Sequence, residues 1–137
     1  MLFFESIEAH PADWSALIFK DKVITFGELR QTVDNWAAYL QAKGLQKGER
    51  VGLFSKNCPE FVAAYHAIVK AGGVVVPINF MLSPTETSFI IKDASVKMMF
   101  VQEVIDLEAA LAKRGCDPVE QITFAEISAA PEAVPAP

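Results

Sequence analysis

The sequence is poor in residues that mark several common protein classes. Only two of its 137 residues are cysteines; Cys58 and Cys116 lie far apart and form neither a CxxC pair nor a metal-ligand spacing. We interpret them as free thiols, which are typical of the reducing cytoplasm. His10 and His66 are the only histidines, and neither has a partner at ligand spacing. No metal site is therefore expected.

Positive charge is neither abundant nor clustered. The sequence has 12 lysines and arginines against 17 acidic residues, for a formal net charge of −5. No basic run is longer than Lys113-Arg114. Nucleic-acid binding needs clustered basic side chains that displace counterions from phosphates. We therefore expect no nucleic-acid partner.

Long hydrophobic runs are also missing. The longest stretch without a charged residue, 71–85, contains two prolines and is shorter than the roughly 20 residues of a membrane-spanning helix. The first residues lack a basic region and include Glu5 and Glu8, unlike a secretory signal. The sequence thus predicts no membrane span and a cytoplasmic location.

What is present is a large apolar fraction. Hydrophobic residues make up 52% of the chain, and the mean hydropathy is +0.27. This excess indicates that some apolar surface is meant for a neighbouring polypeptide. The length fits one domain, which we place at residues 1–130. The proline- and alanine-rich residues 131–137 are interpreted as a tail or linker.

The N-terminal half begins with a predicted hairpin. A short helix is expected near residues 3–7, followed by paired strands at 16–19 and 23–24. Thr25 and Glu28 form a capping box, in which each side chain satisfies a free backbone N–H at a helix start. The helix that follows has an apolar stripe along one face, which is expected to pack against the core: Phe26, Leu29, Val33, Trp36, Ala37 and Leu40.

From residue 50 onward, strands and helices alternate. This alternation predicts a mostly parallel sheet with helices on both faces, an α/β fold of three layers with the hairpin at its start. Strands are expected at 50–54, 74–77, 97–101 and 121–124. Helices are expected to begin at Pro59 and Ser83 and to cover 106–114 and 125–128. The side chains expected to face the core are Phe61, Val62, Tyr65, Ile68, Val69, Phe89, Ile90 and Ile91.

The segment 69–79 joins a helix end to a strand. Gly72 and Gly73 should stop the helix, since glycine adopts the left-handed conformation found past helix C-termini. Residues 74–76 are β-branched and apolar, as in a strand covered on both sides. Pro77 should end that strand because it lacks an N–H.

A series of short segments resembles the adenylate-forming (AMP-binding) superfamily, which includes acyl-CoA synthetases, luciferases and peptide-synthetase adenylation domains. They occur in the family's order: ITFGEL at 24–29, RVGL at 50–53, NCPEF at 57–61, KAGGVVVPIN at 70–79 and IIKDASVKMMFV at 90–101. The sequence around Pro77, with Pro84 shortly after it, is more similar to the acyl-CoA synthetase branch than to peptide-synthetase domains. That branch includes ligases of long- or medium-chain fatty acids. The resemblance implies the N-terminal subdomain of that fold.

The resemblance also implies a reaction. Such enzymes use ATP and magnesium to convert a carboxylate to an acyl-adenylate, and then form a thioester with coenzyme A. Their phosphate loop and catalytic lysine lie downstream of the position of Pro137. We therefore expect an N-terminal fragment of a ligase that is structural and inactive alone, binds no cofactor itself, and has the remainder of the ligase polypeptide as partner.

Few residues of this chain are candidates for a functional site. No catalytic residue is assigned. Asn57 follows a strand, where open α/β sheets bind ligands, so it is the candidate for cofactor binding; the alternative is a side chain that fixes the loop. The family-signature residues are expected to be structural: Thr25, Glu28, Leu29, Lys70, Ala71, Gly72, Pro77 and Asn79. Met81 stands where many relatives carry arginine.

Two alternatives to a ligase fragment stay open. One is a stand-alone α/β binding or interaction module derived from the same family. The other is a flavodoxin-like cofactor carrier, for which no cofactor residues can be named. As an isolated fragment, the chain is expected to form a homodimer or to swap elements through its uncovered surface.

Overall fold

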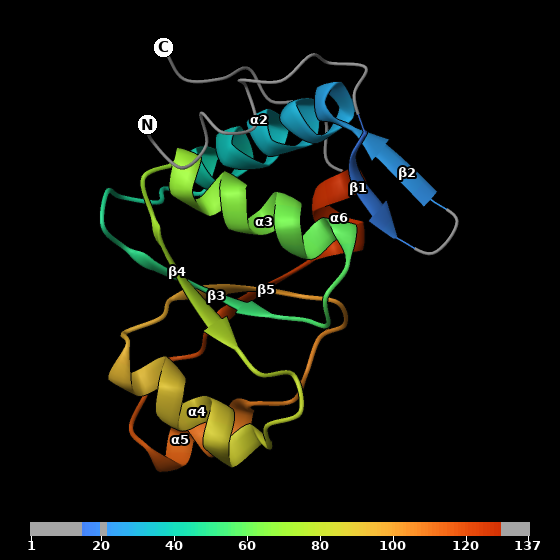
Figure 1. Ribbon diagram of the computed structural model, residues 1–137. Helices are drawn as coiled ribbons and strands as arrows, with labels where there is room; N and C mark the ends of the chain where they lie inside the picture. Colours follow the sequence, from blue (N-terminus) through green and yellow to red (C-terminus); the bar gives the residue numbers. More distant parts are fainter. Residues whose placement is uncertain (1–14, 20–21, 130–137) are drawn as a thin grey trace.

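The computed structural model describes residues 15–19 and 22–129, drawn in colour in Figure 1. The expected N-terminal helix near 3–7 and the tail at 131–137 lie outside this range. The described elements follow one another in this order: β1 (Ser15–Phe19), β2 (Lys22–Thr25), α2 (Phe26–Ala42), β3 (Arg50–Phe54), α3 (Pro59–Lys70), β4 (Val74–Ile78), α4 (Pro84–Asp93), β5 (Met98–Val101), α5 (Glu108–Lys113), β6 (Glu120–Thr123) and α6 (Phe124–Ala129).

The central feature is a parallel four-stranded sheet of order β4-β3-β5-β6. Helices α2, α3 and α6 lie on one face of this sheet, and α4 and α5 lie on the other (Figure 1). The antiparallel pair β1–β2 forms a separate two-stranded sheet beside α2. The expected three-layer α/β fold with an N-terminal hairpin is confirmed.

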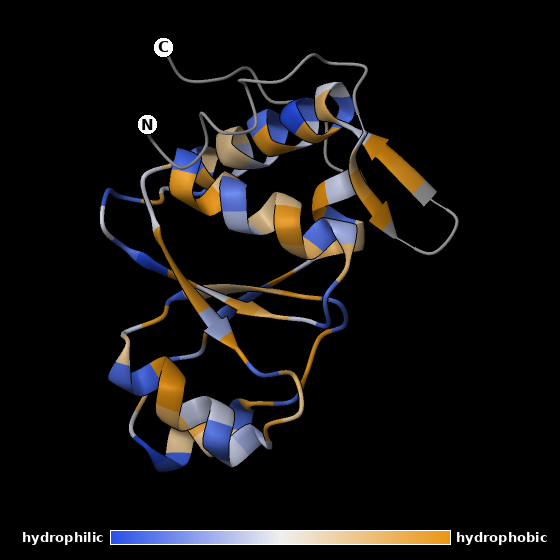
Figure 2. Ribbon diagram, viewed as in Figure 1, coloured by the Kyte–Doolittle hydropathy of each residue, from blue (hydrophilic) through white to orange (hydrophobic). Residues whose placement is uncertain are grey.

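The capping box at the start of α2 is present. The Glu28 N–H donates to Thr25 Oγ1 at 3.2 Å, and the Thr25 N–H donates to Glu28 Oε1 at 3.4 Å. The apolar stripe of α2 faces the sheet (Figure 2). Leu40, which is fully buried, lies at the C-terminal end of that stripe, as the helical period predicts.

Three aromatic rings join the layers on the α2 side. Trp36 of α2 stacks on Phe100 of β5 at 6.0 Å and on Phe124 of α6 at 5.9 Å, and the two phenylalanine rings are themselves 6.0 Å apart, measured between ring centroids. Such pairs contribute about 0.5–1.5 kcal/mol beyond their area burial. They attach the short helix α6 to the core.

A second core lies on the opposite face of the sheet. It is formed by buried apolar side chains from the sheet, from α4 and α5, and from the loops beside them: Ile78, Ile91, Val96, Met99, Val101, Leu107 and Leu111. Gly52 of β3 lies against this cluster. A Cβ atom at Gly52 would lie 2.9 Å from Met99 Cβ, so the absence of a side chain allows β3 and β5 to pack closely.

The expected buried face of α3 is wrong in part. Ile68 is fully buried, and the partly buried Phe61 and Tyr65 pack against the core, as expected. Val62 and Val69 are only partly buried and do not belong to that cluster. The deepest positions are instead alanines: Ala63, Ala64 and Ala67. Helix α3 packs against both α2 and the sheet (Figure 1), and close approach of backbones favours small side chains there.

The interpretation of the strand at 74–76 is correct in part: Val75 and Val76 pack against the cores on opposite faces of the sheet, as expected for a strand covered on both sides. The rest needs correction. β4 is an edge strand of the sheet, Val74 is 47% exposed, and the strand continues through Pro77 to Ile78. The Val74 N–H donates to Glu49 O at 2.8 Å, so by the alternation of a parallel ladder the nitrogen of Pro77 faces the open edge. Proline therefore removes no hydrogen bond from the ladder, and the strand does not end there.

The buried face of α4 differs from the expectation as well. Ile91 is buried, but Phe89 is 56% exposed, and the hydroxyl-bearing Thr87 and Ser88 are fully buried. Arg114, at the end of α5, contacts both Ser88 and Phe89. Its Nε donates to Ser88 Oγ at 2.7 Å, and its guanidinium lies 5.4 Å from the centroid of the Phe89 ring.

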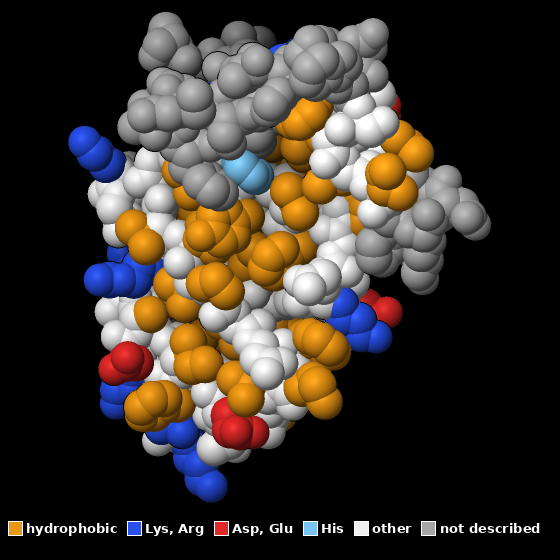
Figure 3. Space-filling model, in the orientation of Figure 1, with side chains coloured by type: hydrophobic (Ala, Val, Ile, Leu, Met, Phe, Trp, Pro, Cys, Tyr) orange, Lys and Arg blue, Asp and Glu red, His pale blue; other side chains and the backbone are white. Residues whose placement is uncertain are grey.

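Apolar side chains gather over α3 and β4 on the face shown in Figure 3. Exposed large apolar residues also occur in loops and strands elsewhere, with Ile18 73%, Met81 79% and Val104 68% exposed. Among the described residues, no helix has both the length and the hydrophobicity to cross a membrane.

Candidate functional site

The chain connections create a switch point at the carboxyl edge of the sheet. Helix α3 follows β3 on one face of the sheet, and α5 follows the neighbouring strand β5 on the other face (Figure 1). The loops after β3 and β5 therefore diverge at neighbouring positions, which is where open α/β sheets bind ligands. Asn57 lies in the first of these loops.

The loop that carries Asn57 is fixed by its neighbours. The buried Ser55 hydroxyl donates to Lys56 O at 2.8 Å, and the Lys56 N–H donates to Gln102 Oε1 at 3.3 Å. Asn57 itself is exposed, and within the described part of the chain no hydrogen bond reaches its amide. Ser55 and Gln102 thus hold the loop, and Asn57 stays a candidate for contact with a ligand.

Cys58 is the only thiol at this edge within the described ranges. Its Sγ lies 3.7 Å from Ser55 Oγ, and partial burial raises its pKa. His66, further along α3, has a pKa lowered by burial. A thiol with a raised pKa is a poor nucleophile, so no catalytic role is assigned to Cys58.

The loop after β4 borders the same edge. Asn79 Oδ1 accepts a hydrogen bond from the Met81 N–H at 2.9 Å, which fixes the turn. Lys56 Nζ lies 5.5 Å from the centroid of the Phe80 ring and so connects this loop to the loop after β3. The edge therefore presents Asn57, Phe80 and Met81 to a neighbour.

The signature residues are spread over the structure rather than gathered in one site. Leu29 and Ala71 are buried. Lys70 pairs with Asp34 across α2 and α3. Gly72 has a φ of +94°, and its carbonyl accepts from the Gly48 N–H at 2.8 Å. Each contact stabilises a helix end, a core position or a turn.

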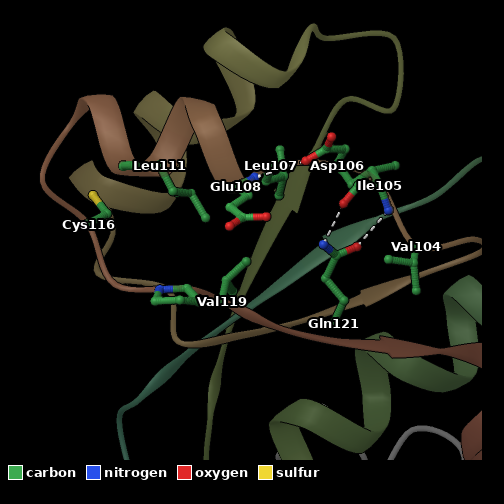
Figure 4. Close-up of a pocket in the computed structure, with 11 residues that line it drawn as sticks. Val104, Ile105, Asp106, Leu107, Glu108, Leu111, Cys116, Val119 and Gln121 are labelled. Carbon is green, nitrogen blue, oxygen red and sulfur yellow. Dashed lines mark hydrogen bonds between the residues drawn. The ribbon is translucent and has the colours of Figure 1, made fainter.

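Sequence reasoning missed one cavity of the described structure. A pocket of about 680 Å³, open to solvent, lies between α5 and β6 (Figure 4). Gln121 of β6 forms part of its wall; the Gln121 amide donates to Ile105 O at 2.7 Å and accepts from the Ile105 N–H at 2.9 Å. No motif marks the pocket, because its lining comes from loops without regular spacing.

The described residues contain no group of three or more His, Cys, Asp or Glu side chains that could hold a metal ion. Gly72 and Gly73 follow a helix rather than begin one, so they do not form a phosphate loop. Within the described residues, no magnesium site, phosphate loop or chemical step is assigned.

The fold and the carboxyl edge define an α/β domain of the adenylate-forming type. The profile of the family described as AMP-binding enzyme matches residues 3–135. The chain therefore belongs to the AMP-binding enzyme family.

Relatives of several activities match the chain. It is 33% identical over 103 residues to 4-hydroxybutyrate–CoA ligase 2 of Metallosphaera sedula, covering 75% of this chain and 19% of that protein. It is 31% identical over 115 residues to a long-chain-fatty-acid–CoA ligase of Bacillus subtilis, covering 84% and 20%. Gramicidin S synthase 2 of Brevibacillus brevis is 33% identical over 102 residues, covering 74% and 2%. The chain spans about a fifth of the length of the two ligases.

Solved structures share the fold. The O-succinylbenzoate coenzyme A synthetase of Bacillus subtilis, in complex with AMP, superposes with a TM-score of 0.80 at 24% identity, covering 96% of this chain and 33% of that one. The N-terminal subdomain of NpsA from Klebsiella oxytoca superposes with a TM-score of 0.76 at 24% identity, covering 92% and 30%. The expected N-terminal subdomain fold is thereby confirmed.

Proposed function

We propose that the chain is the N-terminal part of an AMP-forming acyl-CoA synthetase. In this proposal the whole enzyme uses ATP and magnesium to convert a carboxylate to an acyl-adenylate, and then transfers the acyl group to coenzyme A. The observation that carries the proposal is the family match over residues 3–135, supported by ligases among the relatives.

The role proposed for these residues is structural. The carboxyl edge carries Asn57 but no described residue to which a catalytic role is assigned, and no phosphate-binding loop follows a described strand. Adenylation needs donors and a metal arranged around the phosphates. These groups are assigned to the remainder of the ligase polypeptide, which is the proposed partner.

The acyl-CoA branch and a fatty-acid substrate are finer parts of the proposal. They are based on the sequence of residues 77–79 and on the similarity to ligases such as the long-chain-fatty-acid–CoA ligase. Gramicidin S synthase 2 matches at a similar identity. Experiment must therefore determine which thiol accepts the acyl group. A cytoplasmic location is proposed because the half-buried Cys58 and Cys116 are both free.

The test combines the isolated chain with a chimera. The 137-residue chain alone should catalyse no ATP–pyrophosphate exchange with any acid of a panel from acetate to palmitate. A Bacillus subtilis long-chain-fatty-acid–CoA ligase whose matched segment is replaced by this chain should retain fatty-acid-dependent exchange. The same ligase with the segment deleted serves as control. Exchange by the isolated chain, or a soluble but inactive chimera, would contradict the proposal.

An interaction module is the second candidate, because Met81 and Val104 are strongly exposed apolar side chains. Light scattering separates the two candidates. A fragment of a ligase is expected to dimerise, swap elements or aggregate through its uncovered surface, so the homodimer stays a prediction. A monodisperse monomer that binds no hydrophobic dye would favour the module.

A further inference from the structure

The two edges of the parallel sheet differ in what they present to solvent. At the β4 edge, Pro77 has no N–H to offer an added strand. At the β6 edge, no such residue occurs. We propose that the β6 edge and the adjoining pocket bind an extended segment of a partner polypeptide that carries one large apolar side chain flanked by lysine or arginine.

The hydrogen-bond pattern shows which backbone groups of β6 are free. The Glu120 N–H donates to Lys97 O at 2.9 Å, so the backbone groups of Glu120 and Ile122 face β5. The N–H and C=O of Gln121 and the N–H of Thr123 consequently face away from the sheet. Within the described ranges no hydrogen bond reaches these groups, so they can pair with an added strand.

The pocket lies on the side where an added strand would place a side chain. Ile122 belongs to the core on the α2 side, so the alternating residues Val119 and Gln121 face the α5 side, where the pocket lies. The pocket walls include the apolar residues Val104, Ile105, Leu107, Leu111 and Val119. A strand beside β6 has alternate side chains on this same side, so one apolar side chain can enter the pocket while backbone bonds form.

Charge at the pocket indicates the flanking residues of the partner. Asp106 and Glu108 are among the lining residues, and no lysine or arginine is. Figure 4 shows the Glu108 carboxylate directed from the start of α5 toward the segment of Val119. Within the described part of the chain, neither carboxylate forms an ion pair. Opposite charge on the partner would complement this rim and increase the association rate.

The probe is the synthetic peptide acetyl-Lys-Val-Leu-Val-Lys-amide, added to the isotopically labelled 137-residue chain and followed by backbone amide NMR shifts. In an extended peptide, leucine and both lysines share one face. Saturable shifts are expected at Gln121, Thr123 and the residues that line the pocket. Replacing both lysines by glutamate, or N-methylating the peptide nitrogens that face β6, should weaken binding.

Two matched pairs of variants locate the peptide. Gln121→Pro removes an outward N–H at the β6 edge, whereas Val75→Pro removes an outward N–H at the opposite β4 edge. Ala112→Trp obstructs the pocket, whereas Ala109→Trp adds the same bulk at an exposed position of α5 outside the lining.

The first member of each pair should weaken the dissociation constant about ten-fold, or ~1.4 kcal/mol, and the second should change it little. Absence of saturable shifts, equal binding to all variants, or equal binding of the glutamate peptide would overturn the proposal. The proposal is independent of the acyl-CoA synthetase assignment, because it rests on this edge and pocket alone.

Discussion

Gly52 offers a sharp test of how closely the sheet and its second core pack. Gly52 lies in β3, the inner strand between β4 and β5, and does not have a positive φ. A Cβ atom there would lie 2.9 Å from Met99 Cβ, 3.3 Å from Ile78 Cδ1 and 3.3 Å from Val96 Cγ1. The nearest of these atoms is fixed to the backbone of β5, so it cannot move as a flexible side-chain end can.

The expected effect of Gly52→Ala is the difference of two terms. Added bulk in a packed core costs about 1–3 kcal/mol, whereas replacing glycine at a compatible backbone conformation stabilises by about 0.4–1 kcal/mol through the unfolded state. We therefore expect a net loss of about 0–2.6 kcal/mol, centred on ~1.3 kcal/mol, in the free energy of unfolding.

Urea denaturation followed by tryptophan fluorescence measures this loss. Trp36 is buried among aromatic rings, so its emission should report unfolding of the core. Gly44→Ala is the matched control, because Gly44 has a φ of +92° but no atom within 4 Å of the added Cβ; any loss there reflects backbone strain alone. A Gly52→Ala variant more stable than the parent chain would refute the close packing of β3 against β5.

Three further perturbations test other parts of the structure. Thr25→Ala removes the capping hydroxyl of α2 and should cost about 1 kcal/mol in the same urea assay, whereas Thr25→Ser should retain most of the stability; equal loss in both would exclude the cap. Lys70→Ala breaks a partly exposed ion pair with Asp34 and should cost no more than about 1 kcal/mol; a larger loss would show an additional role for Lys70. Burial lowers the pKa of His66, so below its unfolded pKa of about 6.5 the unfolded chain binds the proton more readily; stability should fall as pH drops from that value toward the folded pKa, and His66→Gln should reduce this dependence.

The order of elements could be predicted because local signals and the tertiary structure agree. The Thr25–Glu28 capping box, Pro59 at a helix start and Gly72 at a helix end each act through groups within a few residues. The expectation for Gly72 is confirmed by its φ of +94°. Such signals do not depend on the position of an element in the sheet, so they can be recognised from the sequence alone.

Side-chain burial was harder to predict because it depends on neighbours distant in sequence. The apolar run of β4 predicted a strand covered on both faces. Val75 and Val76 do pack against opposite cores, but β4 lies at the sheet edge and Val74 is 47% exposed. In α4, Phe89 is exposed although apolar, and Arg114 of a later segment contacts both Ser88 and the aromatic ring. The pocket beside β6 was missed for the same reason, since its lining combines a strand with loops on either side of α5.

Pro77 shows how one residue can have different consequences in sequence and in structure. As a local signal it predicts the end of a strand, because it has no N–H for a ladder. In the structure, the parallel register with β3 directs its nitrogen to the open side, so the ladder remains intact and the edge loses a donor instead. An added strand at β4 can therefore receive a hydrogen bond from Val75 but none from Pro77. If two copies of the chain associate through sheet edges, the missing N–H at Pro77 favours pairing through β6 over pairing through β4.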